Sequence, residues 1–103
     1  MVMQFKIYYV YVVQCADGTL YTGYTDDVER RIAAHNAGKG GSYTRAHRPV
    51  SLLIAWQFPT KSAALRAEYA FKHLSREQKL RIVEAFAAYN GGTLAFPLEK
   101  VNS

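Results

Sequence analysis

The sequence contains one cysteine, Cys15, among its 103 residues. A single cysteine cannot form an internal disulfide, so a fold held together by disulfide bridges is excluded. Cys15 and the scattered His47 and His73 also lack the spacing of zinc ligands, so no zinc site is expected.

Long apolar runs are missing as well. The longest uncharged apolar run, at residues 7–13, is far shorter than the roughly 18 residues that span a bilayer. The first residues, MVMQFK, show no charged leader followed by a long apolar stretch, so no secretion signal is expected. These absences predict a cytoplasmic protein that does not enter membranes.

Acidic residues are scarce, because 8 Asp and Glu face 13 Lys and Arg, which gives a formal net charge of +5 and a pI near 9.5. This balance favours nucleic acid or another polyanion as the partner. The basic residues and histidines gather in two clusters: Arg30, Arg31, Lys39, Arg45, His47 and Arg48, and then Arg66, Lys72, His73, Arg76, Lys79 and Arg81.

Tyrosine, in contrast, is abundant near the start of the chain, where two β patterns flank a turn signal. Residues 7–13 are β-branched or aromatic, Asp17-Gly18 marks a turn, and residues 20–25 resume the pattern. A strand that is apolar on both faces is usually central in its sheet. The sequence therefore predicts a β-hairpin whose first strand is central.

A helix is predicted directly after the hairpin. Asp26 is the expected N-cap, with Glu29 three residues later in the capping-box position, and Gly38 is the expected left-handed terminator. Arg31 and His35 lie four residues apart, so they share one helix face. That face adjoins the buried edge of the helix, from which both side chains can reach into a cleft.

Residues 38–49 are glycine-rich and basic, and are expected to form a mobile loop or a turn of irregular helix. A Walker phosphate loop is excluded because its spacing requires a glycine at position 33, where this chain has Ala33. Contact of the loop with nucleic-acid phosphates and a merely solvated loop are both left open.

The second half of the chain predicts a strand and two helices. Residues 50–58 are mostly apolar, which is typical of a buried strand. Thr60 or Ser62 is expected to cap the next helix, and Ser75 to cap the last one with Gln78 at the third helical position.

This order of elements predicts an α+β fold, with a small three-stranded, mainly antiparallel sheet flanked by three or more helices. At 103 residues the chain has room for one core and not for two. Residues 1–90 are assigned to this domain. Residues 91–103 are assigned to a C-terminal tail, which either packs through its apolar residues or stays loose.

Two tripeptides of the hairpin carry a family resemblance. Tyr9-Val10-Tyr11 is followed after nine residues by Tyr21-Thr22-Gly23. These resemble the paired motifs of the GIY-YIG nuclease superfamily, with Tyr9 in place of the usual glycine of the first motif.

The downstream residues extend this resemblance. Arg31 comes eight residues after Gly23, where the superfamily has its catalytic arginine, and His35 follows it. Glu68 stands at the position of the metal-binding glutamate. The match covers roughly residues 7–85 and is most similar to the small stand-alone bacterial branch (UPF0213-like). That branch in turn is similar to the nuclease subunit of the eukaryotic structure-specific junction-cutting endonuclease.

The resemblance implies a metal-dependent DNA endonuclease that hydrolyses phosphodiester bonds with one Mg²⁺ or Mn²⁺ ion held by Glu68. It implies that Tyr11 deprotonates the attacking water, directly or in a network with Tyr21. Arg31 would stabilise the phosphate, and His35 would orient one of these groups or share the proton transfer.

The residue types suit that chemistry. A guanidinium carries forked donors that match a phosphate, and a carboxylate is a preferred ligand of Mg²⁺. A tyrosine with its ordinary pKa near 10 is a poor base unless a polar partner favours its phenolate. Tyr9 and Gly23 are expected in structural roles, with Gly23 letting the backbone approach the site closely.

DNA is the expected partner, with branched and single-stranded forms left open. The residues expected to bind nucleic acid are Lys39, Tyr43, Arg45, Arg48, Lys72 and Arg76. Larger relatives carry separate DNA-binding domains that are not seen in this sequence. We therefore expect low sequence specificity, recognition of DNA shape, or a protein partner that supplies specificity.

Each assignment has a structural alternative. Strand tyrosines usually serve packing, and packing is the role expected of Tyr8, Tyr24 and Tyr89. Arg31 could be a solvated helix arginine, as Arg30 is expected to be. His35 could be a histidine favoured by a helix C-terminus.

Glu68 lies at the border of an apolar helix stripe, where a carboxylate without a partner would be costly. It could pair with Arg66, Lys72 or Arg31 for structural reasons alone. At the level of the whole chain, the alternative functions are a non-catalytic nucleic-acid-binding module and an interaction module in DNA repair.

Overall fold

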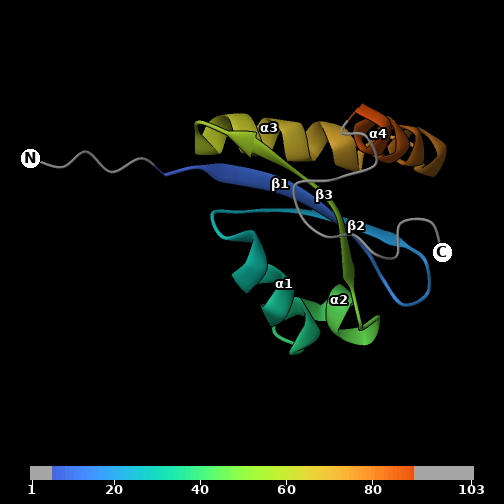
Figure 1. Cartoon of the computed structure of the whole chain (residues 1–103). Coiled ribbons are helices and arrows are strands. Elements are labelled where there is room, and N and C mark those ends of the chain that lie inside the picture. Colours follow the sequence, from blue (N-terminus) through green and yellow to red (C-terminus); the bar gives the residue numbers. More distant parts are fainter. Residues whose placement is uncertain (1–5, 90–103) are drawn as a thin grey trace, which may run out of the picture.

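The computed structural model describes residues 6–89, in which one antiparallel sheet lies between two pairs of helices (Figure 1). The elements are β1 (Tyr8–Gln14), β2 (Leu20–Thr25), α1 (Val28–Asn36), α2 (Ser42–Ala46), β3 (Ser51–Phe58), α3 (Lys61–Lys72) and α4 (Arg76–Tyr89). This confirms the predicted α+β fold with a three-stranded antiparallel sheet. The predicted C-terminal tail lies outside the described residues.

The apolar strand β1 is central, as predicted, because the strand order is β2-β1-β3. Both neighbours pair with it in antiparallel orientation, and this register places Tyr11 between Gly23 of β2 and Ala55 of β3. Strand β2 therefore lies at one edge of the sheet, and a glycine stands beside the central tyrosine.

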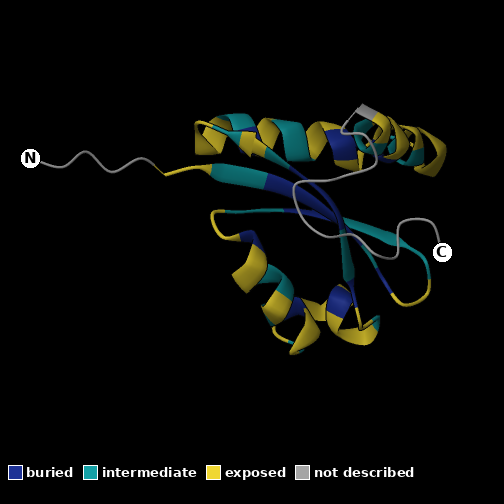
Figure 2. Cartoon of the chain, viewed as in Figure 1, coloured by how far each residue is buried: buried dark blue, intermediate teal, exposed yellow. Residues whose placement is uncertain are grey.

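Two hydrophobic clusters form on opposite faces of the sheet. On the Tyr11 face, Val13 packs with Val28 of α1, whereas on the other face Val12 packs with Phe71 of α3 and Val83 of α4. Figure 2 shows the buried residues concentrated in the strands between the helix pairs. Helices α1 and α2 cover the Tyr11 face of the sheet, so this face does not open on a cleft.

The helix ends are set by local hydrogen bonds. The N-cap of α1 is Asp27 and not the predicted Asp26, because the Asp27 side chain accepts from the backbone N–H of Arg30. Of the two predicted caps of α3, Thr60 and Ser62, the structure shows Thr60. Ser75 and Gln78 form the predicted reciprocal capping box before α4. These helices therefore begin where side-chain acceptors meet the first free N–H groups.

The basic segment at residues 38–49 contains the short helix α2 at its centre, with irregular chain on both sides of the helix. The chain leaves α1 through Gly38, whose φ of 84° is in the left-handed region, as predicted for the terminator. Between residues 6 and 89, none of the helices has the length and apolar character needed to cross a membrane.

Candidate active site

Tyr11 lies at the centre of the candidate site and is almost completely buried, with 1% of its surface exposed. Its ring extends over Gly23 on the neighbouring strand. A Cβ atom built on Gly23 would lie 2.5 Å from the Tyr11 hydroxyl oxygen, far inside contact distance. Position 23 must therefore be glycine for the Tyr11 side chain to lie across β2.

Arg31 reaches the Tyr11 hydroxyl from α1. Its Nε–H donates to that oxygen at 3.3 Å, and its Nη2 donates to the carbonyl of Gly40 at 3.1 Å. The Tyr11 hydroxyl and the Gly40 carbonyl thus fix the guanidinium from two different segments, and its positive charge lies next to the phenol.

His35 contacts the same hydroxyl and is 0% exposed. Its Nε2 lies 2.8 Å from the Tyr11 hydroxyl oxygen, and its Nδ1 lies 2.7 Å from Oγ1 of Thr44, itself 1% exposed. Arg31 and His35, one turn apart on α1, therefore converge on Tyr11, and Thr44 of α2 supports His35 from behind.

Gly40 leaves the space that this arrangement needs. A Cβ atom at Gly40 would lie 2.0 Å from Nδ1 of His35, so a larger residue would displace the imidazole. Thr44 and Gly40 were not predicted as site residues. The sequence signals at these positions are the glycine-rich basic segment and its Gly-Lys-Gly and Tyr43-Thr44 pairs, and they do not give either residue a role.

Burial and charge shift the two titrating groups of this cluster in opposite directions. Burial raises the pKa of Tyr11, against the hydrogen bond and positive charge of Arg31, which lower it. Burial lowers the pKa of His35, and the charge of Arg31 lowers it further. At neutral pH the phenol is therefore protonated and the imidazole is uncharged.

Tyr21 packs against the hydrophobic cluster of Tyr11 and is only partly buried. Its ring meets the edge of the His35 ring at a centroid distance of 5.4 Å and stacks on Tyr43 at 6.2 Å. Tyr43 in turn stacks on His47 at 4.2 Å, and its hydroxyl donates to Thr19 at 2.7 Å. This stack holds α2 against the β1–β2 hairpin.

Glu68 approaches from α3, on the other face of the sheet, with 15% of its side-chain surface exposed. Its carboxylate lies 3.5 Å from Nζ of Lys72, which makes Lys72 its partner among the three cations that the sequence offered. Burial is the main cause of the raised Tyr11 pKa, and the negative charge of Glu68 adds to it. The carboxylate therefore acts on Tyr11 by charge, without a direct hydrogen bond.

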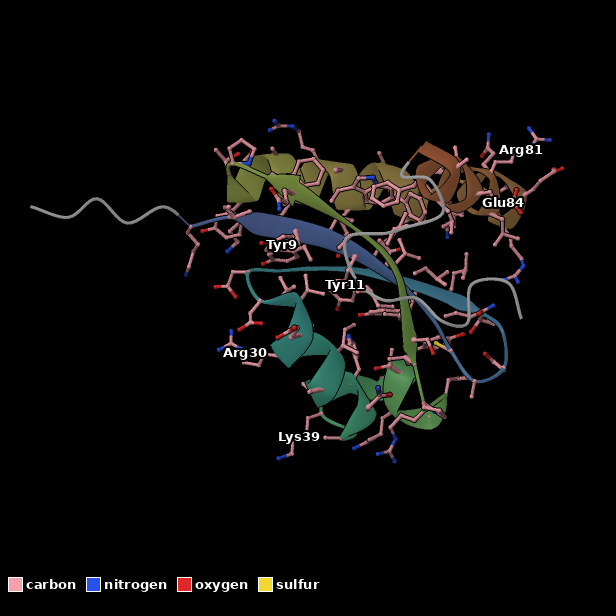
Figure 3. All side chains as sticks on the ribbon, viewed as in Figure 1. Tyr9, Tyr11, Arg30, Lys39, Arg81 and Glu84 are labelled. Atoms are coloured by element: carbon pink, nitrogen blue, oxygen red, sulfur yellow. The ribbon has the colours of Figure 1, made fainter. Side chains whose placement is uncertain are left out.

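The predicted nucleic-acid-binding residues have varied surroundings. Three of them already contact other groups of the protein: Lys72 pairs with Glu68, Arg48 donates to the carbonyl of Arg45, and Arg76 donates to the carbonyl of Gly18 at 3.0 Å. Lys39 and Arg45 are exposed, and Figure 3 shows Lys39 at the outer end of the α1–α2 side. These two side chains form no hydrogen bond or ion pair with residues 6–89, so they are the most available of the six for a nucleic acid.

Comparison with known proteins identifies the family. The model of the GIY-YIG catalytic domain matches residues 7–81, most of the described chain. The chain belongs to the GIY-YIG family. This confirms the resemblance drawn from the paired tyrosine motifs and places the protein in a nuclease superfamily, which implies a nucleic-acid substrate.

The relatives of this GIY-YIG domain include small proteins of bacteria and archaea. It is 56% identical to UPF0213 protein SH2523 of Staphylococcus haemolyticus, over 75% of this chain and 94% of the relative. It is also 56% identical to UPF0213 protein VNG_2274C of Halobacterium salinarum, over 71% of this chain and 95% of the relative. These names specify no activity, substrate or metal.

Solved structures agree on the fold. The solution NMR structure of UPF0213 protein BH0048 from Bacillus halodurans matches with a TM-score of 0.52 and 51% identity, over 77% of this chain and 84% of that chain. The structure of protein EF2693 from E. faecalis matches with a TM-score of 0.57 and 44% identity, over 81% and 88% of the two chains. The GIY-YIG fold of residues 6–89 is thus shared with solved relatives.

Proposed function

We propose that this GIY-YIG domain is a metal-dependent endonuclease that hydrolyses phosphodiester bonds of DNA with low sequence specificity. The observation that carries the proposal is the position of Arg31. Its guanidinium binds the Tyr11 hydroxyl and also lines an open cavity beside β2, so it can contact a phosphate and the phenol at the same time.

The direction of the hydrogen bonds around His35 supports a proton path. The Thr44 hydroxyl lies 3.5 Å from the carbonyl oxygen of Gly41, which can only accept. If Thr44 donates there, its oxygen accepts from Nδ1–H of His35. The Nε2 atom then carries no proton and accepts the O–H of Tyr11.

This arrangement favours a relay over a resting phenolate. Burial keeps Tyr11 protonated, and the lowered pKa of His35 keeps the imidazole neutral and able to accept. In the proposed step the attacking water gives a proton to the Tyr11 oxygen while the Tyr11 proton moves to Nε2 of His35. The water oxygen bonds to phosphorus, and the bond from phosphorus to the leaving oxygen breaks with its electron pair.

Glu68 is the proposed metal ligand. Within the described chain no group of three or more His, Cys, Asp or Glu side chains is placed to hold a metal ion, so Glu68 would be a lone carboxylate ligand. This donor set fits Mg²⁺, which keeps several waters and binds through one or two carboxylates and substrate phosphates. A bound Mg²⁺ or Mn²⁺ would neutralise charge on the leaving oxygen.

The test is cleavage of single-stranded, duplex and branched DNA by purified protein, with Mg²⁺ and with chelator. The variant is Glu68→Gln, and the matched control is Glu84→Gln, which makes the same change on the exposed surface of α4 (Figure 3). We expect metal-dependent cleavage that is lost in Glu68→Gln and kept in Glu84→Gln.

The other outcomes are also informative. DNA binding without cleavage in every condition would favour the alternative, a non-catalytic nucleic-acid-binding module. Cleavage that survives Glu68→Gln would remove Glu68 as the metal ligand. If the Tyr11→Phe variant cleaved DNA in a metal-dependent way at the wild-type rate, the proposed proton relay through Tyr11 would be wrong.

A further inference from the structure

A cavity of about 600 Å³ lies beside the edge strand β2, between the first turns of α1 and α3. Binding pockets for small ligands fall between about 300 and 1,000 Å³, so a single nucleotide fits this volume. Arg31 forms part of its wall, and the same side chain binds the Tyr11 hydroxyl. The cavity therefore adjoins the candidate active site.

The wall of this cavity carries an excess of positive charge. Lys6, Arg30, Arg31 and Lys61 line it together with one carboxylate, Asp26. Asp26 is already paired, at 3.1 Å with Nζ of Lys6 and at 3.3 Å with Nη2 of Arg30. The negative charge is thus offset within the wall, and an anion would meet an electropositive surface.

Lys61 is the cation best placed to bind an added anion. It is exposed, and among the described residues no acidic side chain pairs with it. It begins α3, whereas Arg31 comes from α1 on the other face of the sheet. A phosphate in the cavity could therefore contact cations from both sides of the β2 edge.

Two aromatic rings complete the wall. Tyr8 and Tyr24 both line the cavity and are only partly buried, although strand tyrosines of this kind were expected to serve packing alone. Tyr24 pairs with Val10 across β1 and β2, so it lies on the same face as Tyr8. Rings of this kind offer a surface on which a nucleobase can stack.

We propose that this cavity is a subsite for the nucleotide next to the scissile phosphate. Lys61 contacts the phosphate of that nucleotide, and Tyr24 contacts its base. The inference rests on the proposed nuclease function, because Arg31 would then hold the scissile phosphate at the mouth of the same cavity. The flanking nucleotide would fix the register of the strand relative to Tyr11 and would do so without reading its sequence.

The test measures binding in chelator, so that cleavage does not enter. A short fluorescein-labelled oligodeoxythymidylate and a labelled duplex are titrated by fluorescence anisotropy over a range of salt concentrations. The variants are Lys61→Ala, Tyr24→Leu and Tyr24→Phe. The control is Arg81→Ala, which removes a cation from α4, on the other side of the sheet from Arg30 (Figure 3).

The affinity for a probe that binds falls with salt, so the slope of log affinity against log salt is negative. Lys61→Ala should reduce the magnitude of this slope by about 0.7 to 0.9, the contribution of one phosphate contact. Arg81→Ala should leave the slope unchanged. Tyr24→Leu should weaken binding about tenfold, the usual loss for one stacked base, whereas Tyr24→Phe keeps the ring and should bind like the wild type.

Three results would overturn the subsite: no binding of either probe, an unchanged slope in Lys61→Ala, or equal affinities of the leucine and phenylalanine variants. The phenylalanine variant also controls for folding at position 24. Failure of the nuclease proposal would give a different result: the variants would still change DNA binding as described, but the wild type would cleave DNA under no condition.

Discussion

Replacing Thr44 with valine removes one hydroxyl from the buried core of the site and nearly preserves the shape of the side chain. Nδ1 of His35 lies 2.7 Å from this hydroxyl, and both residues are at most 1% exposed. In Thr44→Val the Nδ1 atom would have no hydrogen-bond partner in either tautomer, and water cannot replace the lost hydroxyl without opening the site. A buried donor or acceptor left without a partner costs about 1–3 kcal/mol of the free energy of unfolding.

A loss of this size is measurable. For a domain of about 100 residues each 1 kcal/mol shifts the melting temperature by roughly 4–8 °C, so Thr44→Val should melt at least about 4 °C below the wild type. Urea denaturation gives the same difference as a free energy. The control is Thr44→Ser, which keeps the hydroxyl and loses one methyl group, at a cost of about 0.8 kcal/mol.

The tautomer of His35 gives a second readout that does not depend on stability. We expect ¹⁵N NMR to find the proton on Nδ1 in the wild type and in Thr44→Ser. In Thr44→Val the proton should shift toward Nε2, where Tyr11 then has to accept it. The reasoning fails if the wild type carries the proton on Nε2, or if Thr44→Val changes neither the tautomer nor the stability.

Three further predictions concern other parts of the same structure. Gly23→Ala places a Cβ 2.5 Å from the buried Tyr11 hydroxyl, so thermal unfolding should show a loss of about 1–3 kcal/mol from overpacking; a wild-type melting temperature would contradict the packing described. His35 has a lowered pKa in the folded protein, so stability should be constant above its unfolded pKa of about 6.5 and fall as pH drops below it, by up to 1.4 kcal/mol per pH unit. Urea midpoints measured from about pH 7 to pH 5 check this, and flat midpoints would mean that His35 is not buried in its neutral form. Asp27→Ala should cost about 1 kcal/mol as the loss of an N-cap, whereas Asp26→Ala should change stability by less than about 0.5 kcal/mol; the reverse order in denaturation would restore Asp26 as the cap.

Much of the fold could be predicted because it depends on short-range patterns. The β-branched and aromatic run of β1, the turn at Asp17-Gly18 and the capping box before α4 each act within a few residues. The predicted N-cap of α1 was wrong by one position because two aspartates stand side by side. Asp26 forms an ion pair with Lys6, which precedes β1. Which of the two aspartates caps α1 therefore depends on a contact outside the helix.

The candidate site could be predicted only in part. Spacing and family resemblance pointed to Tyr11, Arg31 and His35, which the fold brings together on one hydroxyl. Thr44 could not be found, because its contact with His35 depends on how an irregular glycine-rich segment folds back on α1. No periodicity in the sequence specifies that path.

The faces of the sheet show the same limit. Tyr11 and Val12 lie on opposite faces of the sheet, as the alternation of side chains along a strand requires. It could not show that a helix pair covers each face, nor that Tyr24 borders a cavity, because both depend on where α1 and α3 begin relative to the edge of β2.

The short helix α2 makes the geometry of the site dependent on a local opening equilibrium. With only five residues, α2 has little helical stability of its own and is held by Thr44 on His35 and by the stack of Tyr43 on Tyr21. Detachment of α2 would remove the partner of His35 and leave β1, β3, α3 and α4 packed. The fraction of molecules with an assembled site is therefore set by the docking free energy of α2, and amide hydrogen exchange in that helix reports it separately from global unfolding.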